Sequence, residues 1–559
     1  MLTEEKQRAA WDRLKRELRD MRLDEAQKTM MAIDWRATIQ LALDKDDWEA
    51  SNAVSMSVEL LDYLGHFNEA RERIRPLADH VDPRLRQLRR EDYVAPRDLN
   101  ERRRLKSDVW VLFHQGMAYY RLQHYSRARD LFELGEWACL QSLKFGDEFS
   151  YKSTLARLYY GFGLIYREQY AYRTAQDYFL RSIELTSSES RMAPNPSNRA
   201  RGHSLWTDLA SCRALAFGLG YIHHDLGQPA LALPLLLMAR AILSRAGETL
   251  VSGLVELIYY NTVRSAYGDD PVRLDEAIEG LKRCFSAFTE RQHQLYEMRA
   301  AHSLALALTQ RARQIAISRS ALERGDLNEA QQYCQLAERR AVQLKDFKLQ
   351  CLLLVCRSRI ERKRGHFEKA QELATRALKT VGEDFLLIRV RALTARAEAS
   401  SSLGRYESAL QDLLLCDSST AQVSNPRLRA VALLRCAQIY ATTGQSRQAS
   451  ETFEKYLSIK DSVVNAEVRQ SESQVRTELA RVAEGRDFVV RMIDDNLDPH
   501  TIERRLHIFL AEWARSRSAS DREAAQQLGV SRQTLLNWSS EKGTRGEFLP
   551  GKNRRLRKL

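Results

Sequence analysis

The chain has 559 residues, of which 44% are hydrophobic and 29% are charged, and this balance excludes global disorder. Its length exceeds that of one compact domain, so several domains or an extended repeat array are expected. The formal net charge of +13 is uneven: from Thr501 onward 13 Lys/Arg oppose 6 Asp/Glu, a net of +7, which leaves +6 for the first 500 residues. A basic end on a nearly balanced body favours a polyanion-binding tail.

Helix-forming residues dominate the composition. Ala, Leu, Arg, Glu and Gln are abundant and only 24 Gly and 11 Pro are present, so we predict an all-α fold. The eight Cys residues form no CxxC pair and fall mostly among Ala and Leu, which predicts buried free thiols in a reducing compartment. The opening MLTEEKQRAAWDRLKREL is too charged for a secretory signal, and no run of eighteen apolar residues occurs. We therefore expect a cytoplasmic protein without a membrane partner.

One short pattern recurs between residues 64 and 449. An apolar helix is followed by Gly or a substitute, one residue, an aromatic residue or Leu, two residues and then Ala. Gly can end the first helix of a hairpin in a left-handed conformation, the aromatic ring wedges between the two helices, and Ala permits their close approach. The copies are LGHFNEA (64–70), LQHYSRA (122–128), QYAYRTA (169–175), LGQPALA (226–232), the degenerate VRLDEA (272–277), RGDLNEA (324–330), RGHFEKA (364–370), LGRYESA (403–409) and TGQSRQA (443–449).

The better copies extend this pattern on both sides of the Ala. Gly116, Gly163 and Gly220 lie twelve residues before it, and Phe132, Phe179 and Phe453 lie four residues after it. These residues resemble the tetratricopeptide repeat, and the spacings of 40, 39 and 40 between the last four Ala positions are similar to those of bacterial MalT-like signalling regulators. The resemblance implies a superhelix of about nine hairpins. The first hairpin lies in an N-terminal helical region at 1–106, and residues 107–460 form the tetratricopeptide superhelix itself. A helical bundle without repeats is the alternative.

In tetratricopeptide geometry the side chains of each first helix line a concave groove. Aromatic and Arg side chains in such a groove suit a protein, a peptide or an anionic ligand. For each residue the alternative is that it packs or is simply solvated. The groove residues that the resemblance implies are Tyr120, Arg121, Tyr160, Arg167, Tyr221 and His224.

Irregular spacing among the earlier copies indicates insertions. The polar stretch Ser187–Ser204 is predicted to be a loop. The Arg-rich stretch Asp82–Lys106 is predicted to be a second insertion, which forms either a solvated surface or a binding patch.

A connector helix is predicted at 461–497, after the last repeat. Its Val residues at 468, 475, 482 and 489 recur every seven residues, which is half of a coiled-coil seam. This leaves open a dimerising helix or a linker packed on the last repeat. Asp498–Pro499 then gives a helix start signal, and the helix to Ser516 is expected to turn Leu506, Ile508, Phe509 and Trp513 inward.

The stretch EAAQQLGVSRQTLLNW (523–538) has helix-turn-helix spacing. Ala525 falls where two helices cross closely, Gly529 where the turn requires positive φ, and Ser531 where the second helix needs an N-cap. Val530, Leu535 and Trp538 supply the apolar contacts. We predict a helix-turn-helix domain at 498–541, with its first helix ending at Leu528 and its second spanning Arg532 to about Ser540.

The segment AAQQLGVSRQTL resembles the core of Fis-type helix-turn-helix domains, although Asn537-Trp538 replaces their usual Lys-Leu and also occurs in transposase-like and repressor-like units. The second helix of such a domain enters the major groove of double-stranded DNA, where Arg suits guanine and Gln or Asn suits adenine. The basic tail at 542–559 is expected to follow phosphates or a minor groove, or else to be a solubilising end. The predicted DNA-binding residues are Ser531, Arg532, Gln533, Thr534, Asn537, Lys542, Arg545, Lys552, Arg554 and Arg555.

The sequence carries no catalytic or metal-binding motif. HExxH, GxSxG and a metal spacing of Cys and His are absent, and the G-x-x-x-x-G-K skeleton at 546–552 is followed by Asn553 in place of Ser or Thr. We therefore expect no enzymatic activity, no metal and no cofactor.

Together these features predict a bacterial transcriptional regulator associated with the nucleoid. Its repeats would sense a protein or peptide partner, and its C-terminal unit would bind DNA as a homodimer, because one unit reads only a few base pairs. Two alternatives remain: a tetratricopeptide scaffold or adaptor for protein assembly, and an accessory DNA-binding factor of a mobile element or defence system.

Overall fold

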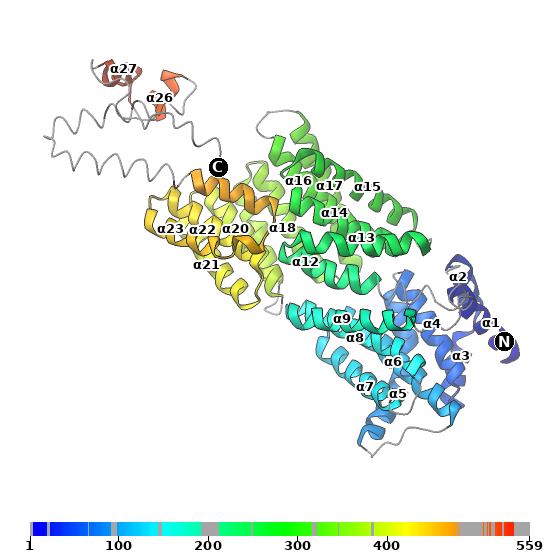
Figure 1. Ribbon diagram of the computed structural model, residues 1–559. Helices are drawn as coiled ribbons and strands as arrows, with labels where there is room; N and C mark the ends of the chain where they lie inside the picture. The colour runs from blue at the N-terminus through cyan, green and yellow to red at the C-terminus, as the bar shows by residue number, and fades with distance from the viewer. Residues whose placement is uncertain are drawn as a thin grey trace. The chain divides into compact units, whose positions relative to one another are not determined.

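The computed structural model in Figure 1 is helical throughout the part of the chain that it describes. It has two compact units, Met1–Val475 and Arg476–Leu559. The described residues are 4–19, 23–64, 66–90, 98–143, 148–191, 212–246, 250–315, 321–344, 346–381, 385–477, 479, 507, 511, 514–515, 520–527 and 530–540.

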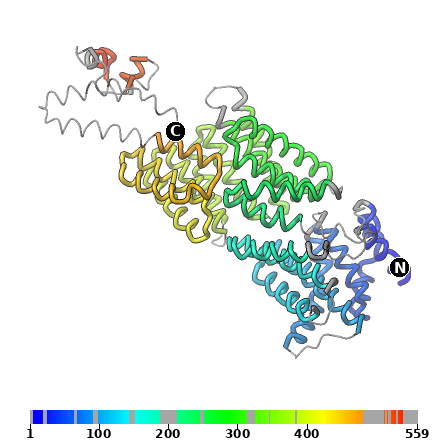
Figure 2. The backbone as a smooth tube through the Cα atoms, viewed as in Figure 1, coloured from blue at the N-terminus to red at the C-terminus, as the bar shows by residue number. Residues whose placement is uncertain are grey.

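Helical hairpins follow one another along the described part of the first unit, as the tube in Figure 2 shows. Helices α1 (Glu4–Arg19), α2 (Leu23–Ala32) and α3 (Trp35–Asp44) precede them. The hairpins are α4 (Trp48–Leu64) with α5 (Phe67–Arg90), α6 (Leu99–Arg121) with α7 (Tyr125–Leu143), α8 (Glu148–Glu168) with α9 (Tyr172–Arg191), η1 (Ala214–Gly220) and α12 (Tyr221–Leu226) with α13 (Pro229–Ala246), α14 (Leu250–Tyr267) with α15 (Pro271–Glu290), α16 (Gln294–Ile315) with α17 (Ala321–Gln343), α18 (Phe347–Lys363) with α19 (Phe367–Thr380), α20 (Leu386–Ser402) with α21 (Tyr406–Gln422), and α22 (Pro426–Thr442) with α23 (Ser446–Leu457). The predicted all-α fold of stacked tetratricopeptide-like hairpins is confirmed.

The turns inside the hairpins use left-handed backbone, as the pattern predicts. In four copies the Gly takes positive φ, and in two copies that lack Gly another residue does so. These residues are Gly227, Gly365, Gly404 and Gly444, with Gln123 and Tyr170 in the substitute role. The prediction is wrong for Gly325, which lies inside α17 instead of ending a helix. No atom lies within 4 Å of the position that a Cβ would take there, and its φ is not positive, so nothing around it requires a glycine.

Close approach between paired helices explains the small residues of the pattern. The Ala of every copy is buried, with at most 5% of its surface exposed. A Cβ on Gly116 would lie 2.3 Å from the Phe132 ring, and one on Gly163 would lie 2.6 Å from the Phe179 ring. The prediction that Ala lies where paired helices approach closely is therefore confirmed, and in two hairpins a Gly and a Phe ring meet in the same way.

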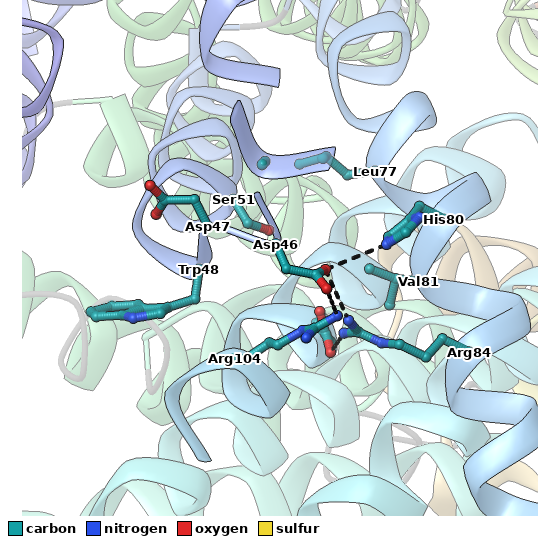
Figure 3. Close-up of a pocket in the computed structure, with 11 residues that line it drawn as sticks. Asp46, Asp47, Trp48, Ser51, Leu77, His80, Val81, Arg84 and Arg104 are labelled. Carbon is teal, nitrogen blue, oxygen red and sulfur yellow. Dashed lines mark hydrogen bonds and ion pairs between the residues drawn. The ribbon is translucent and has the colours of Figure 1, made fainter. Parts of the chain in front are cut away.

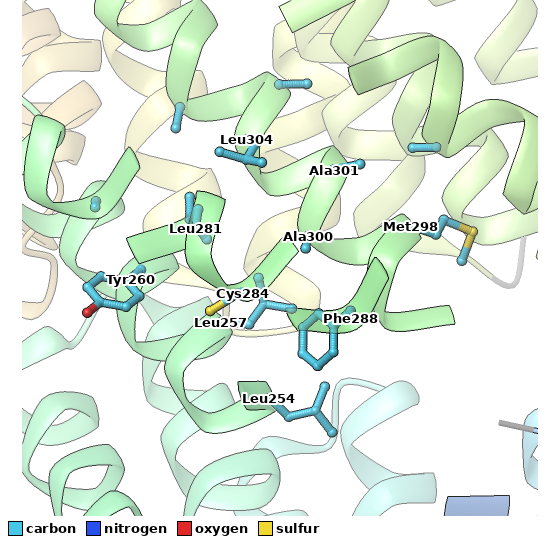
Figure 4. Close-up of a cluster of buried hydrophobic side chains, with 14 of the residues drawn as sticks. Leu254, Leu257, Tyr260, Leu281, Cys284, Phe288, Met298, Ala300, Ala301 and Leu304 are labelled. Atoms are coloured by element: carbon cyan, nitrogen blue, oxygen red, sulfur yellow. The ribbon is translucent and has the colours of Figure 1, made fainter. Parts of the chain in front are cut away.

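The hydrophobic core runs between successive hairpins. Figure 4 shows side chains of α14, α15 and α16 interleaving, among them Leu254, Leu281, Phe288 and Leu304, all buried. All eight Cys residues are free and buried, as predicted. The core is therefore shared between neighbouring repeats rather than closed within one of them.

The two predicted insertions are partly helical. Residues 187–191 continue α9, so the predicted loop begins later than Ser187, and residues 192–204 lie outside the described residues. The Arg-rich stretch forms the end of α5 and the start of α6, with 91–97 outside the described residues.

The described part of the connector packs on the repeats. After η2 (Lys460–Ser462), residues 466–477 are helical, and Val468 and Val475 are buried in the first unit. The Val464 amide donates to the Gly227 carbonyl at 2.8 Å, and Arg469 pairs with Asp269 at 2.5 Å. This half of the connector follows the packed-linker alternative, whereas its Val residues at 482 and 489 lie outside the described residues.

The described part of the second unit is a small helix pair, α26 (Asp521–Gln527) and α27 (Arg532–Ser540). Its core consists of Ala511, Ala514, Ala524, Ala525 and Leu535, with Val530 packed against them. The Ser531 hydroxyl accepts from the Thr534 amide at 3.0 Å, which is the predicted N-cap. The span of α27 agrees with the predicted second helix. Leu506, Ile508, Phe509, Trp513, Leu528 and Gly529 lie outside the described residues, and so does the side chain of Trp538.

Candidate functional site on the inner face of the repeats

First helices from distant repeats meet on the inner face of the first unit. At the end of α12, the Asp225 carboxylate accepts from Arg391 of α20 at 3.1 Å and from Arg427 of α22 at 2.9 Å. It also accepts from the Tyr172 hydroxyl at 2.6 Å. Burial opposes ionisation of this carboxyl, but the two arginines hold its pKa below the ordinary value. The inner face is therefore lined from both sides by charged groups.

A second contact of this kind lies nearer the N-terminus. Lys348 of α18 donates to Glu168 of α8 at 2.7 Å and to the Tyr125 hydroxyl at 2.5 Å. Burial raises the pKa of Glu168, but Arg167 and Lys348 outweigh it and bring the pKa to about 2. Early and late repeats are thus tied together by ion pairs, because their first helices face each other.

All six predicted groove residues have internal partners, and four of them lie on the first helices α6 and α8. Arg121 donates to Asp62 at 2.7 Å, and Arg167 donates to Glu168 at 2.7 Å and to the Phe217 carbonyl at 2.5 Å. Arg167 also donates to the Tyr120 hydroxyl at 3.2 Å. The Tyr160 ring lies 5.8 Å from the Phe179 ring, and burial raises its pKa. These contacts stabilise the repeats, so the groove role of these residues remains a prediction.

Tyr221 and His224 complete the predicted set on α12. Tyr221 is 41% exposed, and Arg167 stacks over its ring at 4.8 Å. The His224 Nδ1 lies 3.1 Å from the Thr262 hydroxyl. Burial, together with the charge of Arg427, lowers the pKa of His224 to about 3, so this imidazole is neutral near pH 7.

The sequence reasoning missed three inner-face residues on the middle repeats: Arg264 of α14, His302 of α16 and Arg359 of α18. Each is partly exposed. Burial and the charges of Arg391, Arg264 and Arg359 lower the pKa of His302 to about 3. One signal was available, since Arg264 is the only basic residue of α14.

A small cavity lies at the N-terminal end of the unit, and charged side chains that line it already pair with one another. Figure 3 shows Asp46 facing His80, Arg84 and Arg104. Arg84 also pairs with Asp108. The cavity measures about 20 Å³, room for one water molecule. The Arg-rich stretch therefore supplies ion pairs here and leaves no space for a ligand.

The C-terminal helix pair exposes part of its predicted DNA-binding set. Ser531, Arg532 and Gln533 are exposed at the start of α27, and Thr534 is partly exposed. Between the two helices, the Val530 amide donates to the Ala525 carbonyl of α26 at 3.0 Å. The side chain of Asn537 and the residues Lys542, Arg545, Lys552, Arg554 and Arg555 lie outside the described residues.

Comparison with known proteins agrees with this fold. Residues 430–462 match the tetratricopeptide repeat model. No curated protein matches the chain at a significant level. Among solved structures, a Rap protein complexed with Competence and Sporulation Factor is similar at 15% identity and a TM-score of 0.46, over 74% of this chain and 99% of that one. Aspartyl phosphate phosphatase F from Bacillus subtilis is similar at 12% identity and a TM-score of 0.41, over 75% and 95%. The human IFIT1 dimer with PPP-AAAA is similar at 13% identity and a TM-score of 0.38, over 82% and 96%.

Two further observations bound the chemistry of the described residues. None of their helices is long and apolar enough to cross a membrane. No cluster of three or more His, Cys, Asp or Glu side chains among them is arranged to hold a metal ion.

Proposed function

We propose that this protein is an interaction adaptor whose tetratricopeptide-like repeats dock a protein partner. The observation that carries the proposal is the outer face of α13, where the exposed residues between positions 230 and 241 are all apolar and uncharged. Leu231, Leu237 and Met238 are 53%, 47% and 52% exposed, and Pro234 and Ala241 on the same side are also exposed. Contiguous exposed apolar side chains on a soluble protein mark interaction sites.

The equivalent face of α19 shows what an ordinary outer face of this chain looks like. When the buried Ala232 and Ala370 are superposed in register, Leu231 corresponds to Lys369 and Met238 to Arg376. The exposed residues of α19 are Glu368, Lys369, Glu372, Arg376, Lys379 and Thr380. Since both helices hold the same place in their hairpins, the repeat fold does not require an apolar surface on α13. A partner that covers this surface accounts for it.

The proposal is tested by placing charges on this face. Burying a half-exposed Leu or Met side chain contributes on the order of 1 kcal/mol, so Leu237→Glu with Met238→Glu is expected to weaken partner binding at least tenfold. The matched control is Thr375→Glu with Arg376→Glu, the same register positions on α19. Tagged chains are purified from the host cell, and partners are quantified by mass spectrometry. The proposal fails if no protein is retained above background, or if both double variants retain the partner equally.

Light scattering of the purified chain shows whether the apolar face of α13 binds a different protein or a second copy of this chain. If the wild type is a dimer and Leu237→Glu with Met238→Glu makes it a monomer, the face is the interface of the homodimer that the sequence predicts. If the wild type is a monomer, the partner is another protein.

DNA binding by the C-terminal helix pair is the second candidate, and it would make the adaptor a transcriptional regulator. The capped start of α27 supports it, because Arg532 and Gln533 are exposed there while Leu535 is buried against α26. Selection of bound DNA from a random pool tests it. Arg532→Ala is expected to abolish sequence selectivity, whereas Arg522→Ala, exposed on α26, is expected to preserve it. Equal selectivity in both variants, or no selected sequence, contradicts this candidate.

A further inference from the structure

We propose that the inner face at α14, α16 and α18 binds a phosphoryl-bearing ligand between Arg264 and Arg359. Nothing in the adaptor proposal requires this site, since the apolar face of α13 and the inner face of the middle repeats are tested by different substitutions.

The two arginines lie on first helices that flank a third. Helix α16 packs against both α14 and α18, so His302 of α16 comes from the helix between the two arginines. Arg264 and His302 both experience the charge of Arg359. All three side chains are partly exposed, so solvent and a small ion can reach them.

Neither arginine forms an ion pair within the described residues, although the Glu467 and Glu398 carboxylates outweigh burial and raise the pKa of Arg359. Arg264 donates to the Gln310 amide oxygen at 3.2 Å and makes no ion pair within the described residues. Arg359 makes neither an ion pair nor a side-chain hydrogen bond there, and the Nε atoms of both arginines are buried without an acceptor. A buried guanidinium group loses its hydrogen bonds to water. Where no protein acceptor replaces them, burial of the group lowers the stability of the fold.

The neighbouring arginines differ, since each has a carboxylate. Arg391 and Arg427 share Asp225, whereas Arg362 and Arg435 contact Glu398 at 2.9 and 3.2 Å. Glu467, the third carboxylate near these arginines, lies 3.9 Å from Arg435. Six guanidinium groups therefore face three carboxylates. Burial and the positive charges of Arg427, Arg359 and Arg391 outweigh Glu467 and lower the pKa of Arg264 to about 10.

This arrangement suits one compact dianion. A phosphoryl group carries nearly two negative charges and three acceptor oxygens, so two guanidinium forks can each bind it in bidentate fashion. The neutral His302 imidazole supplies one more N–H donor. A single carboxylate would neutralise only one of the two arginines. An extended nucleic-acid backbone would be repelled by the Asp225, Glu398 and Glu467 carboxylates interspersed among the arginines.

The first test uses inorganic pyrophosphate with the full chain. Calorimetry is expected to give one site per chain, with affinity reduced at least tenfold in both Arg264→Gln and Arg359→Gln. Arg357→Gln is the matched control, because Arg357 lies on the same helix and is paired with Glu338 at 2.9 Å; it is expected to bind like the wild type. No heat with the wild type, or equal affinity in all variants, overturns the proposal.

Thermal unfolding distinguishes a ligand site from a structural role. If Arg264 serves a ligand, ligand-free Arg264→Gln unfolds at the wild-type temperature or above it, because the substitution removes a repelled charge. Pyrophosphate then raises the unfolding temperature of the wild type but not that of the variant. A ligand-free variant that unfolds well below the wild type and responds normally to pyrophosphate contradicts the proposal.

Three further probes identify the source of the phosphoryl group. ATP tests a free nucleotide, and a phosphoserine peptide tests a modified protein, each against wild type and Arg264→Gln. The same peptide with Glu in place of phosphoserine tests a carboxylate. Arg264-dependent binding of ATP or of the phosphopeptide supports the proposal and names the source. Arg264-dependent binding of the Glu peptide alone overturns it.

Discussion

Gly163→Ala is expected to destabilise the repeat unit, because the Phe179 ring fills the space that the new methyl group needs. The Cβ would lie 2.6, 2.7 and 2.8 Å from three carbons of that ring, whereas carbon atoms in favourable contact stand roughly 3.5–4.0 Å apart. The ring cannot retreat. It is fully buried, and a Cβ on Gly218 of η1 would already lie 2.6 Å from it.

The magnitude follows from two opposing terms. Overpacking a close-packed core costs about 1–3 kcal/mol, and the fixed ring places this site at the upper end. Replacing Gly by Ala within a helix contributes about 0.5–1 kcal/mol of stability. The expected net loss is therefore about 2–2.5 kcal/mol.

Chemical denaturation followed by circular dichroism measures this loss, and hydrogen exchange of the α8 and α9 amides locates it. Gly325→Ala is the matched control, because Gly325 also lies in a helix but has no atom within 4 Å of the new Cβ. It is expected to raise stability by about 0.5–1 kcal/mol. Adding Phe179→Leu to Gly163→Ala is expected to recover part of the loss, since the smaller side chain leaves room for the methyl group. If Gly163→Ala is as stable as Gly325→Ala, the reasoning from ring contact is refuted.

Four more predictions concern the buried histidines, the Asp225 ion pairs, the N-cap of α27 and the thiols. The folded-state pKa of His224 and of His302 is about 3, below the ordinary value of about 6.5, so the unfolded chain binds protons first. The stability that these two neutral histidines contribute is therefore fully present above pH 6.5 and is lost as the pH falls toward 3. Urea titrations at pH 7 and pH 5 measure this loss, and equal unfolding midpoints at the two pH values contradict it. Asp225→Asn leaves two arginines without their carboxylate and is expected to cost about 3 kcal/mol in the same assay, whereas a loss under 1 kcal/mol argues against the network. Ser531→Ala removes the N-cap of α27 and is expected to cost about 1 kcal/mol, read as faster amide exchange in α27 alone. The eight buried thiols are expected to react with a thiol reagent only in denaturant, and fast labelling of the native chain contradicts this.

Much of the fold was readable from the sequence, because its determinants are local. Each hairpin is specified within a short segment. A residue that can adopt the turn conformation ends the first helix, an Ala lies where the two helices come closest, and a large side chain follows four residues later. The same holds for the C-terminal pair, where Ser531 and Leu535 fix the start and the buried side of α27. The error at Gly325 has the same origin: the pattern records that a turn is possible there, and a glycine also fits inside a helix.

The inner and outer surfaces were not readable in this way. Asp225 meets Arg391 and Arg427 across 166 and 202 residues of chain, so no local pattern records their pairing. Two further arginines, Arg264 and Arg359, look like those neighbours in the sequence, but within the described residues the fold gives them no ion pair, and the nearby carboxylates act on them only at longer range.

The sequence by itself therefore determined the helices, their turns and the small residues between them, because these depend on neighbours a few positions away. Only the tertiary structure decided which apolar side chains stay uncovered, as on α13, and which charges stay unpaired, as at Arg264 and Arg359. Exposure and charge balance depend on every element that packs nearby, and the stacking of distant repeats chooses those elements.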